Sequence, residues 1–225
     1  MHILVKFPSR GRPEKLRSTY LKYISMADYP ANLSFLISLD HDDTTHTPTN
    51  RSLLEKFHPN CTIVIGDSVG KIGAVNRDMD KAGPFDILLL ASDDMIPIVK
   101  GYDTIIRNNM KTLYPDTDGV LFFNDGYRQR NLNTLCILGK KYYDRFGYIY
   151  YPGYKSFWCD NEFMEVADLL NKQTYFADVI IKHEHPLWTG EVFDETYSRN
   201  EIIGEHVDKN LYYKRKSNNF GVVLI

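Results

Sequence analysis

The chain has 225 residues, of which 43% are hydrophobic, and a formal net charge of -2. This length is enough for one sizeable α/β domain with its own core, and the near balance of charge gives no global attraction to polyanions such as DNA. The three cysteines, Cys61, Cys136 and Cys159, are odd in number and form no CxxC pair, so neither a disulfide framework nor a structural zinc site is expected.

The apolar segments also bear on where the protein acts. Residues 1–8 are typical of a first core strand and lack the long apolar region of a signal peptide. No apolar stretch approaches the length that crosses a membrane. Because unpaired cysteines suit a reducing compartment, we expect a cytoplasmic protein without a transmembrane segment.

Strand-like and helix-like segments alternate through the first half of the chain. Strands are predicted at residues 3–7, 33–39, 61–65 and 85–91. Helices are predicted after Pro13, at 50–57, from Gly70 with apolar positions Ile72, Val75 and Met79, and at 102–113. This order of strands and helices predicts a parallel, doubly wound α/β sheet.

The second half of the chain has a less regular pattern. Strands are predicted at residues 120–124, 134–138 and 177–182, a short helix at 140–146 and an aromatic loop at 148–155. A helix is predicted from Asp160, with Phe163, Val166, Ala167 and Leu170 on one face. The polar segment after Trp188 is expected to fold back as a lid or to remain a tail.

An aspartate pair, Asp93 and Asp94, directly follows the apolar run at 85–91. That run has the length of a strand buried on both faces, so the acids emerge at the edge where open α/β sheets bind ligands. Adjacent carboxylates repel each other, and a hard divalent ion carrying a diphosphate would relieve the repulsion. A plain strand-to-loop turn is the alternative, because Asp is a common turn residue.

Two other strand ends carry ligand-type side chains. Arg10 and Arg12 lie in the loop after the first strand, where forked guanidinium donors can meet phosphate. Asp40 and Asp42 follow the second strand, where acids accept hydrogen bonds from a ribose or a base. Solvated arginines and a capped acidic turn are the alternatives for each loop taken alone.

A helix start beside the third strand adds Lys71 and Asn76. A helix N-terminus with a nearby lysine favours anions, although the glycine and lysine spacing of a P-loop is absent. Since the ends of four parallel strands open on the same side of one sheet, these residues together predict a nucleotide-diphosphate site.

Two clusters in the second half also carry chemistry. Asp160 and Glu162 begin a helix, whose dipole stabilises the ionised form, and an ionised carboxylate facing a hydroxyl can act as a general base. A capped helix start is the alternative. His183 and His185 alternate along a predicted extended segment, and neutral imidazoles on one face suit Mn-like or Zn-like ions.

These segments resemble the GT-A fold glycosyltransferases, close to the family 2 type of inverting enzymes that use nucleotide sugars. Residues 4–13 resemble the opening strand and nucleotide loop of that family, and residues 70–77 its helix start. Ala91-Ser92-Asp93-Asp94 resembles the D-x-D metal motif, with Ser92 in place of the first acid. Residues 159–163 resemble the E-D-x-D base motif, with Cys159 in place of its glutamate.

The resemblance implies a role for each of these residues. Asp160 would be the catalytic base, with Glu162 as its substitute, and the divalent metal, Mn or Mg, would be held by Asp94 with His183 or His185. The residues implied to bind the donor are Pro8, Ser9, Arg10, Arg12, Asp40, Asp42, Lys71, Asn76, Ser92 and Asp93.

The resemblance further implies a single GT-A-type domain with a Rossmann-like, mostly parallel sheet flanked by helices and an irregular acceptor-side C-terminal half. Residues 1–110 would bind the nucleotide sugar, 111–190 would form the acceptor and catalytic half, and 191–225 a lid or tail. The expected donor is a UDP-sugar. The acceptor would be a glycan or another hydroxyl-bearing molecule contacting Tyr151 and Trp158, and a basic, tyrosine-containing tail at 209–216 leaves a nucleic acid open.

The expected activity is therefore the transfer of a sugar to an acceptor hydroxyl with inversion. A nucleotidyltransferase acting on a sugar phosphate is one alternative, although the loop at 8–13 contains a single glycine where such enzymes need a glycine-rich triphosphate loop. A noncatalytic glycan-binding protein of the same fold is another, and it predicts no metal-dependent hydrolysis of any nucleotide sugar.

Overall fold

The computed structural model describes the backbone of residues 1–184 and 195–222 and the side chains of residues 1–184 and 206–222. None of the described helices is both long enough and apolar enough to cross a membrane. The nine described strands are β1 (Ile3–Ser9), β2 (Leu33–Asp40), β3 (Cys61–Gly66), β4 (Ile87–Leu90), β5 (Met95–Pro97), β6 (Val120–Phe123), β7 (Ile137–Gly139), β8 (Gln173–Phe176) and β9 (Ile181–His183).

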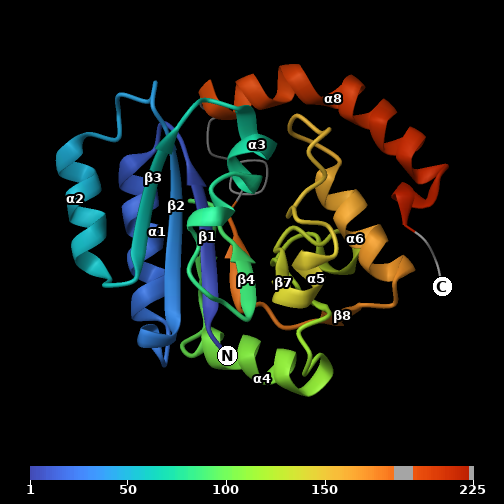
Figure 1. The fold of residues 1–225 in the computed structure, drawn as a ribbon, viewed down its shortest axis with the longest axis horizontal. Coiled ribbons are helices and arrows are strands. Elements are labelled where there is room, and N and C mark those ends of the chain that lie inside the picture. Colours follow the sequence, from blue (N-terminus) through green and yellow to red (C-terminus); the bar gives the residue numbers. More distant parts are fainter. Residues whose placement is uncertain (185–194, 223–225) are drawn as a thin grey trace.

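Helices surround these strands on both sides (Figure 1). The described α-helices are α1 (Pro13–Ser25), α2 (Pro48–Phe57), α3 (Gly70–Asn76), α4 (Tyr102–Leu113), α5 (Lys140–Asp144), α6 (Cys159–Leu169) and α8 (Glu195–Lys216). Short 3-10 helices lie at Pro30–Asn32, Met79–Lys81, Gln129–Asn131 and Asn219–Gly221.

The main sheet has the strand order β3-β2-β1-β4-β7-β6-β8. The first four strands of this order are parallel, as the alternating sequence pattern predicts. Strand β7 runs antiparallel to both β4 and β6, and β8 returns parallel to β6. The mixed α/β fold with a mostly parallel sheet is thus confirmed, and its irregular half begins where β7 reverses direction.

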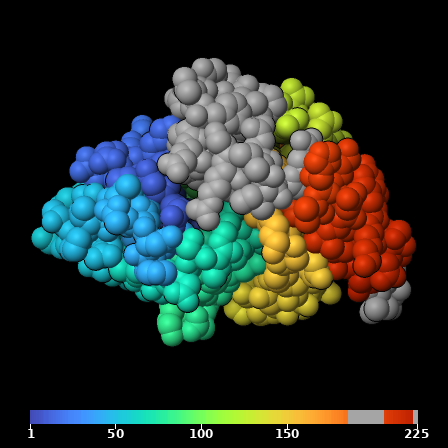
Figure 2. All heavy atoms as spheres, turned by 90° about the horizontal axis from the view of Figure 1, so that it is seen from above, coloured from blue at the N-terminus to red at the C-terminus, as the bar shows by residue number. Residues whose placement is uncertain are grey.

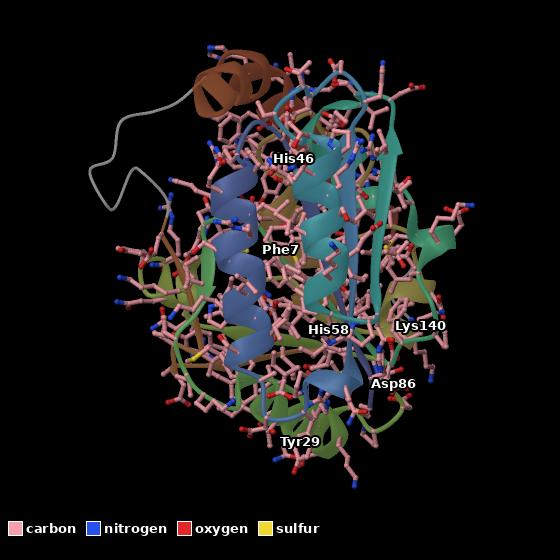
Figure 3. All side chains as sticks on the ribbon, turned by 90° about the vertical axis from the view of Figure 1, so that its left-hand side faces the viewer. Phe7, Tyr29, His46, His58, Asp86 and Lys140 are labelled. Carbon is pink, nitrogen blue, oxygen red and sulfur yellow. The ribbon has the colours of Figure 1, made fainter. Side chains whose placement is uncertain are left out.

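Each face of the sheet has its own apolar core, because successive residues of a strand point to opposite faces. Odd-numbered residues of β1 pack with α1, α2 and α4, whereas Leu4 packs with α3, α5 and α6. Figure 3 shows α1 and α2 side by side over the first face, with His46 near one end of α2 and His58 near the other. All three cysteines are free thiols.

Several predicted boundaries are wrong. Helix α3 ends at Asn76 because Arg77 is extended and Asp78 has a φ of 67° in the left-handed region, so Met79 lies in a separate 3-10 turn. The predicted strand at 134–138 is shifted to Ile137–Gly139, and the one at 177–182 is shortened and shifted to Ile181–His183. Strands β5 and β8 are missing from the prediction.

The short strand β5 pairs antiparallel with β9, and Met95 lies opposite His183. The backbone N–H of Glu184 also donates to the carbonyl of Asp94 at 2.7 Å. This two-stranded ladder joins the aspartate pair to a histidine that lies 89 residues after Asp94 in the sequence.

The polar segment near the C-terminus forms α8 rather than an irregular tail. The helix runs along the side of the molecule where α6 lies (Figure 1). Tyr212 packs into the second core, and Arg215 pairs with Glu162 of α6. The low average hydrophobicity of the segment concealed this helix in the sequence.

Candidate active site

The carboxyl ends of the parallel strands open on one side of the molecule. Figure 2 looks onto that side, where the segment after β2, the start of α3, the aromatic loop and α8 lie around the centre. In the structure the aromatic loop is the connection between α5 and α6, residues 145–158. The charged residues predicted from the strand ends fall into three groups on this side.

The aspartate pair is half-buried and held from two directions. Arg12 Nη1 lies 3.2 Å from Asp93 Oδ1, and the Thr19 hydroxyl donates to the Asp93 carbonyl at 2.8 Å. Burial raises the pKa of Asp93 to about 6, reinforced by the charge of Asp94 and opposed by that of Arg12. The Ser92 hydroxyl donates to Asp94 Oδ1, so the serine that replaces an acid in the motif orients the remaining one.

His183 faces Asp94 from the neighbouring strand. Its Nε2 lies 3.6 Å from Asp94 Oδ2, and its Nδ1 lies 4.0 Å from Asp125 Oδ2. Asp125 is buried, and its Oδ1 accepts from the backbone N–H groups of Tyr127 and Arg128 at 2.8 and 2.6 Å. The imidazole therefore lies between two carboxylates, and a carboxylate beside the second ring nitrogen is a common neighbour of metal-ligating histidines.

A divalent metal would fit between Asp94 and His183. Ligand atoms about 2.1 Å from one ion lie about 3 Å apart, close to the observed separation of 3.6 Å. Among the described residues no group of three or more His, Cys, Asp and Glu side chains is arranged to hold a metal. Mg²⁺-like ions commonly take one or two protein ligands and complete their shell with substrate phosphates and water. His185, the other predicted ligand, lies outside the described residues.

The second group surrounds Asp40 at the end of β2. Arg10 Nη1 lies 2.9 Å from Asp40 Oδ2, and its two terminal nitrogens contact both carboxylate oxygens of Asp42. Arg77 approaches the other side of Asp40, with Nη1 3.3 Å from Oδ1. In this structure Arg10 contacts the acids after β2, whereas Arg12 contacts Asp93. Arg10 and Arg12 belong to one loop and therefore contact acids at the ends of two different strands.

A buried chain of polar groups lies behind Asp40. Lys6, in the middle of β1, donates to Ser38, whose hydroxyl donates to Asp78 Oδ2 at 2.6 Å. Arg77 Nε lies 3.2 Å from the same oxygen of Asp78. Burial lowers the pKa of Lys6 to about 8, partly opposed by Asp78. None of these buried groups was predicted except as part of a strand or helix.

Pro8 and Ser9, which were predicted to begin the loop after the first strand, are instead the last two residues of β1. The Ser9 hydroxyl is 3.4 Å from Nε2 of the buried His46. Asp43 Oδ2 accepts the Gly11 N–H at 2.7 Å, which ties this loop to the one after β2. Gly11 has a φ of 74°, a conformation that a side chain would strain.

Lys71 and Asn76 connect α3 to the aromatic loop. Asn76 donates to the Tyr150 carbonyl at 2.7 Å and accepts from the backbone N–H groups of Ile149 and Tyr150 at 2.9 and 3.1 Å. Lys71 Nζ donates to the Ser156 carbonyl at 3.3 Å and lies 5.9 Å from the centre of the Phe157 ring. Asn76 thus anchors the loop, and Lys71 lies where α3 meets it.

The third group contains the predicted base. Asp160 lies in the first turn of α6, and its carboxylate accepts from the Asn161 N–H at 3.0 Å. The backbone N–H of Asn161 at the helix start favours the ionised form of Asp160. Burial raises the pKa of Asp160, and the charges of Lys71 and His183 only partly oppose this. Lys71 and His183 are therefore near enough to Asp160 for their charges to act on it.

Glu162 occupies a different environment from Asp160. Its two oxygens lie 2.8 Å from Arg215 Nε and Nη2, and Oε2 also accepts from the Tyr154 hydroxyl at 2.7 Å. The side chain is buried. A carboxylate engaged by a guanidinium fork and a phenol is a poor proton acceptor, so of the two candidates Asp160 has the chemistry of a base.

The two predicted acceptor aromatics are also distinguished by their surroundings. Arg215 covers one face of Tyr151, with the guanidinium carbon 3.3 Å from the ring centre. Trp158 is half-buried beside Tyr212 and Tyr213, with ring centres 4.9 and 5.9 Å away. It has a φ of 63° at the N-cap of α6, a strained conformation for a bulky residue and one that recurs at functional sites.

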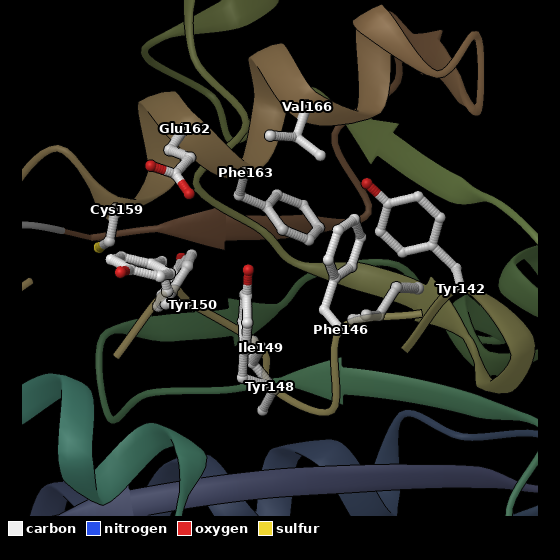
Figure 4. A pocket seen from close by; sticks show the side chains of 11 residues that line it. Tyr142, Phe146, Tyr148, Ile149, Tyr150, Cys159, Glu162, Phe163 and Val166 are labelled. Carbon is white, nitrogen blue, oxygen red and sulfur yellow. The ribbon is translucent and has the colours of Figure 1, made fainter. Parts of the chain in front are cut away.

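A small cavity lies between α6 and the aromatic loop (Figure 4). Glu162, Phe163 and Val166 of α6 line one side, and Tyr148, Ile149 and Tyr150 of the loop the other. Its volume of about 20 Å³ suits a water molecule rather than a sugar ring. The donor and acceptor would therefore bind at the strand edge and not in this cavity.

Asp125, Asp208 and Arg215 are among the residues at or beside the predicted site that sequence reasoning missed. Asp125 follows β6, so the strand-end argument that found Asp40 would also have found it. Asp208 and Arg215 lie on α8 and reach the site from the C-terminal region. No sequence signal marks them, because their partners lie about 50 residues earlier in the chain.

Solved structures of glycosyltransferases share this fold. TarS 1–349 from S. aureus, in complex with UDP-GlcNAc, aligns with a TM-score of 0.68 and 16% identity over 95% of this chain and 64% of that one. The mannosyltransferase PcManGT from Pyrobaculum calidifontis, in complex with GDP-Man and Mn²⁺, aligns with a TM-score of 0.63 and 16% identity, over 81% of this chain and 56% of that one. This chain therefore spans little more than half of PcManGT, and 37% of a longer TarS structure.

The other comparisons give no further identification. No protein-family model matches the chain, and no curated protein matches it. The structural likeness at this low identity shows the fold alone. The expected GT-A-like glycosyltransferase fold is thus confirmed.

Proposed function

We propose that the protein transfers a sugar from a nucleoside-diphosphate sugar to an acceptor hydroxyl, with inversion at the anomeric carbon. One observation carries the proposal: Asp94 and His183 come from two distant segments and face each other at 3.6 Å beside the carboxyl edge of the parallel strands, and the charge of His183 also acts on Asp160. The bound nucleotide sugars in TarS and PcManGT support a donor of the same class.

The donor would lie along the ends of β1, β2 and β4. The acids at the end of β2, Asp40 and Asp42, would accept from the nucleoside, and their arginine partners fix their orientation before it binds. Arg12 and Lys71 would bring positive charge to the diphosphate. A divalent metal bound between Asp94 and His183 would neutralise charge on the leaving diphosphate, and His185 remains a proposed additional ligand.

Asp160 would take the proton from the acceptor hydroxyl as that oxygen attacks the anomeric carbon. The bond to the diphosphate oxygen then breaks on the opposite face, so the product is inverted. Burial raises the pKa of Asp160, which makes its carboxylate a stronger base than an exposed one. Trp158, two residues before Asp160, would contact the acceptor.

The metal role is tested by Asp94→Ala. We expect nucleoside diphosphates to raise the Tm of the wild type more with Mn²⁺ than without it, and this metal-dependent part to vanish in the variant. UDP and GDP, measured separately, would report the base preference. A matched control is Asp144→Asn, which removes an exposed carboxylate of α5 that pairs with Lys140.

Activity is measured on the same proteins as metal-dependent release of nucleotide from UDP- and GDP-sugars, with and without candidate acceptors. Donor release that follows the thermal shift supports the proposal. An unchanged Mn²⁺ titration in Asp94→Ala contradicts the metal role. Pyrophosphate release from a sugar phosphate and a nucleoside triphosphate would instead identify a nucleotidyltransferase.

A further inference from the structure

The C-terminal helix holds the aromatic loop through one buried carboxylate. Asp208 of α8 is 0% exposed. Its Oδ1 accepts the backbone N–H of Lys155 at 2.9 Å, and its Oδ2 accepts those of Ser156 and Phe157, both at 2.8 Å. Three consecutive N–H groups directed at one carboxylate fix the backbone path of that segment, because each bond to a charged acceptor is stronger than a neutral one.

The same segment borders the proposed catalytic residues. The Ser156 carbonyl accepts from Lys71, and the Phe157 ring lies near the same ammonium group. One residue later, Trp158 adopts its left-handed conformation, and α6 begins with Asp160 in its first turn. A shift of the loop backbone would therefore move both Asp160 and the lysine whose charge lowers the pKa of Asp160.

Two other contacts show how closely the loop fits against α8. A Cβ on Gly153 would lie 2.6 Å from the Tyr151 ring and 3.1 Å from Leu211 of α8. Arg215, two helical turns after Asp208 on the same side of α8, covers Tyr151 and pairs with Glu162. The loop therefore packs against both Asp208 and Arg215. Of these two side chains, Asp208 is the one that accepts hydrogen bonds from the loop backbone next to Trp158.

We propose that Asp208 is a positioning residue for sugar transfer: it fixes residues 155–157 so that Asp160, Lys71 and the acceptor surface at Trp158 keep their relative places. This role rests on the proposed function. Asp208 itself touches no substrate. Its loss should impair transfer to the acceptor far more than donor binding, because the donor would also meet Arg12, Asp40 and Asp94 at the ends of β1, β2 and β4.

The test is Asp208→Asn, which keeps the shape of the side chain and replaces one acceptor oxygen by an N–H donor. In hydrogen exchange of the full chain, the peptide covering residues 150–158 should exchange about tenfold faster or more, whereas peptides of β1 and β4 should be unchanged. Asp144→Asn is the matched control, because it makes the same chemical change on an exposed residue.

The second measurement separates positioning from folding. We expect kcat for transfer to fall about 100-fold, with little change in the Kd for nucleoside diphosphate with Mn²⁺ and in donor hydrolysis by water. Asp208→Glu keeps the charge and displaces it, so it should also lower kcat for transfer and leave the Kd for nucleoside diphosphate little changed. This variant replaces Asp208→Asn if Asp208→Asn does not fold.

Three results would overturn the inference. Unchanged exchange at 150–158 would mean that Asp208 does not hold the loop. Faster exchange with wild-type transfer would mean that the held loop does not position the reaction, and equal losses of donor binding and transfer would indicate general damage. If the wild type transfers no sugar from any donor, the proposed function fails, and the exchange measurement alone then decides whether Asp208 holds the loop.

Discussion

The proposed donor side and the proposed acceptor side of the site, called the donor side and the acceptor side below, hold their charged groups in different ways. On the donor side, Arg10 pairs with Asp40 and Arg12 with Asp93, so the partners come from the ends of strands in the same sheet. On the acceptor side, Glu162 and the aromatic loop are held by two residues of α8, which arrive from a distant part of the sequence. The sheet thus builds the donor side, while the acceptor side depends on a helix that the sheet does not fix.

This difference predicts that substitutions will separate the two functions. Changes on α6, α8 or the aromatic loop should alter transfer or stability and spare nucleotide binding. Changes at the strand ends should affect nucleotide and metal binding first. The following predictions test that separation, from the largest expected effect to the smallest.

Asp160→Asn should have the largest effect. Loss of the general base is expected to lower kcat for transfer about a thousandfold, with nucleotide affinity unchanged because Asp160 lies on the acceptor side. In the wild type, transfer should fall as pH drops through the raised pKa of Asp160, since the base must be ionised. Rates are measured by nucleotide release with saturating acceptor.

The matched control is Asp168→Asn, which changes an exposed carboxylate on the same helix. It should transfer sugar at the wild-type rate. If Asp160→Asn also does so, the assignment of the base is wrong. A large loss of nucleotide affinity in Asp160→Asn would contradict the prediction that changes on the acceptor side spare nucleotide binding.

Arg215→Met tests the attachment of α8 to α6. It leaves the buried Glu162 without its guanidinium partner, so the free energy of unfolding should fall by about 3 kcal/mol. Lys216→Met, which breaks an exposed pair with Glu165, should cost less than about 1 kcal/mol. Urea unfolding measures both.

A second substitution distinguishes charge from packing in that result. Arg215→Met combined with Glu162→Gln removes the unpaired buried charge and should recover part of the loss. If stability is not recovered, the contact of Arg215 with the Tyr151 ring contributes more to the free energy of unfolding than the ion pair with Glu162.

Asp93 gives a pH dependence on the donor side. Its pKa of about 6 lies above the ordinary carboxyl value, so between pH 4 and 6 the folded protein holds a proton that the unfolded chain releases. The contribution of Asp93 to stability therefore declines as pH rises through this window and is constant above it. Between pH 4 and 6, the free energy of unfolding of Asp93→Asn should therefore rise relative to that of the wild type by about 1 kcal/mol per pH unit.

Urea unfolding at several pH values measures this difference. The curves for wild type and Asp93→Asn should diverge between pH 4 and 6 and run parallel above pH 7. Arg12→Met should move the divergence to higher pH, because Arg12 opposes the rise in the pKa of Asp93. Curves that stay parallel from pH 4 would falsify the proton uptake.

The smallest effect is expected away from both sides. Asp144→Asn breaks an exposed i,i+4 pair with Lys140 and should change the free energy of unfolding by less than about 0.5 kcal/mol. Nucleotide binding and transfer should equal those of the wild type. A measurable change in either would mean that α5 is coupled to the donor side or the acceptor side through the sheet.

The first half of the fold was predictable because its signals are local. Buried strands such as β4 appear as short apolar runs, and the acids that follow them mark the carboxyl edge. The second half was less predictable. Strand β5 has only three residues, and β8 is half-exposed along its length, so neither has a clear period. The face of α8 that contacts the core is hidden by the charged residues around it.

The candidate site was likewise predictable in its local features and not in most of its long-range contacts. Sequence reasoning placed Asp94 and His183 in one metal site, and the structure brings them within 3.6 Å. It did not distinguish Asp160 from Glu162, because the partner that engages Glu162, Arg215, lies 53 residues later and on another helix. It also expected Asn76 to meet the donor, whereas in this structure its amide bonds to the backbone of the aromatic loop.

The ladder between β5 and β9 has a consequence for how this site tolerates change in sequence length. The pairing of Met95 with His183 fixes the distance between Asp94 and the imidazole, whatever the chain does between these strands. Insertions or deletions in the intervening loops would therefore leave the pair intact. A single residue added within β5 or β9 would turn Lys182 or Glu184 toward Asp94 in place of His183.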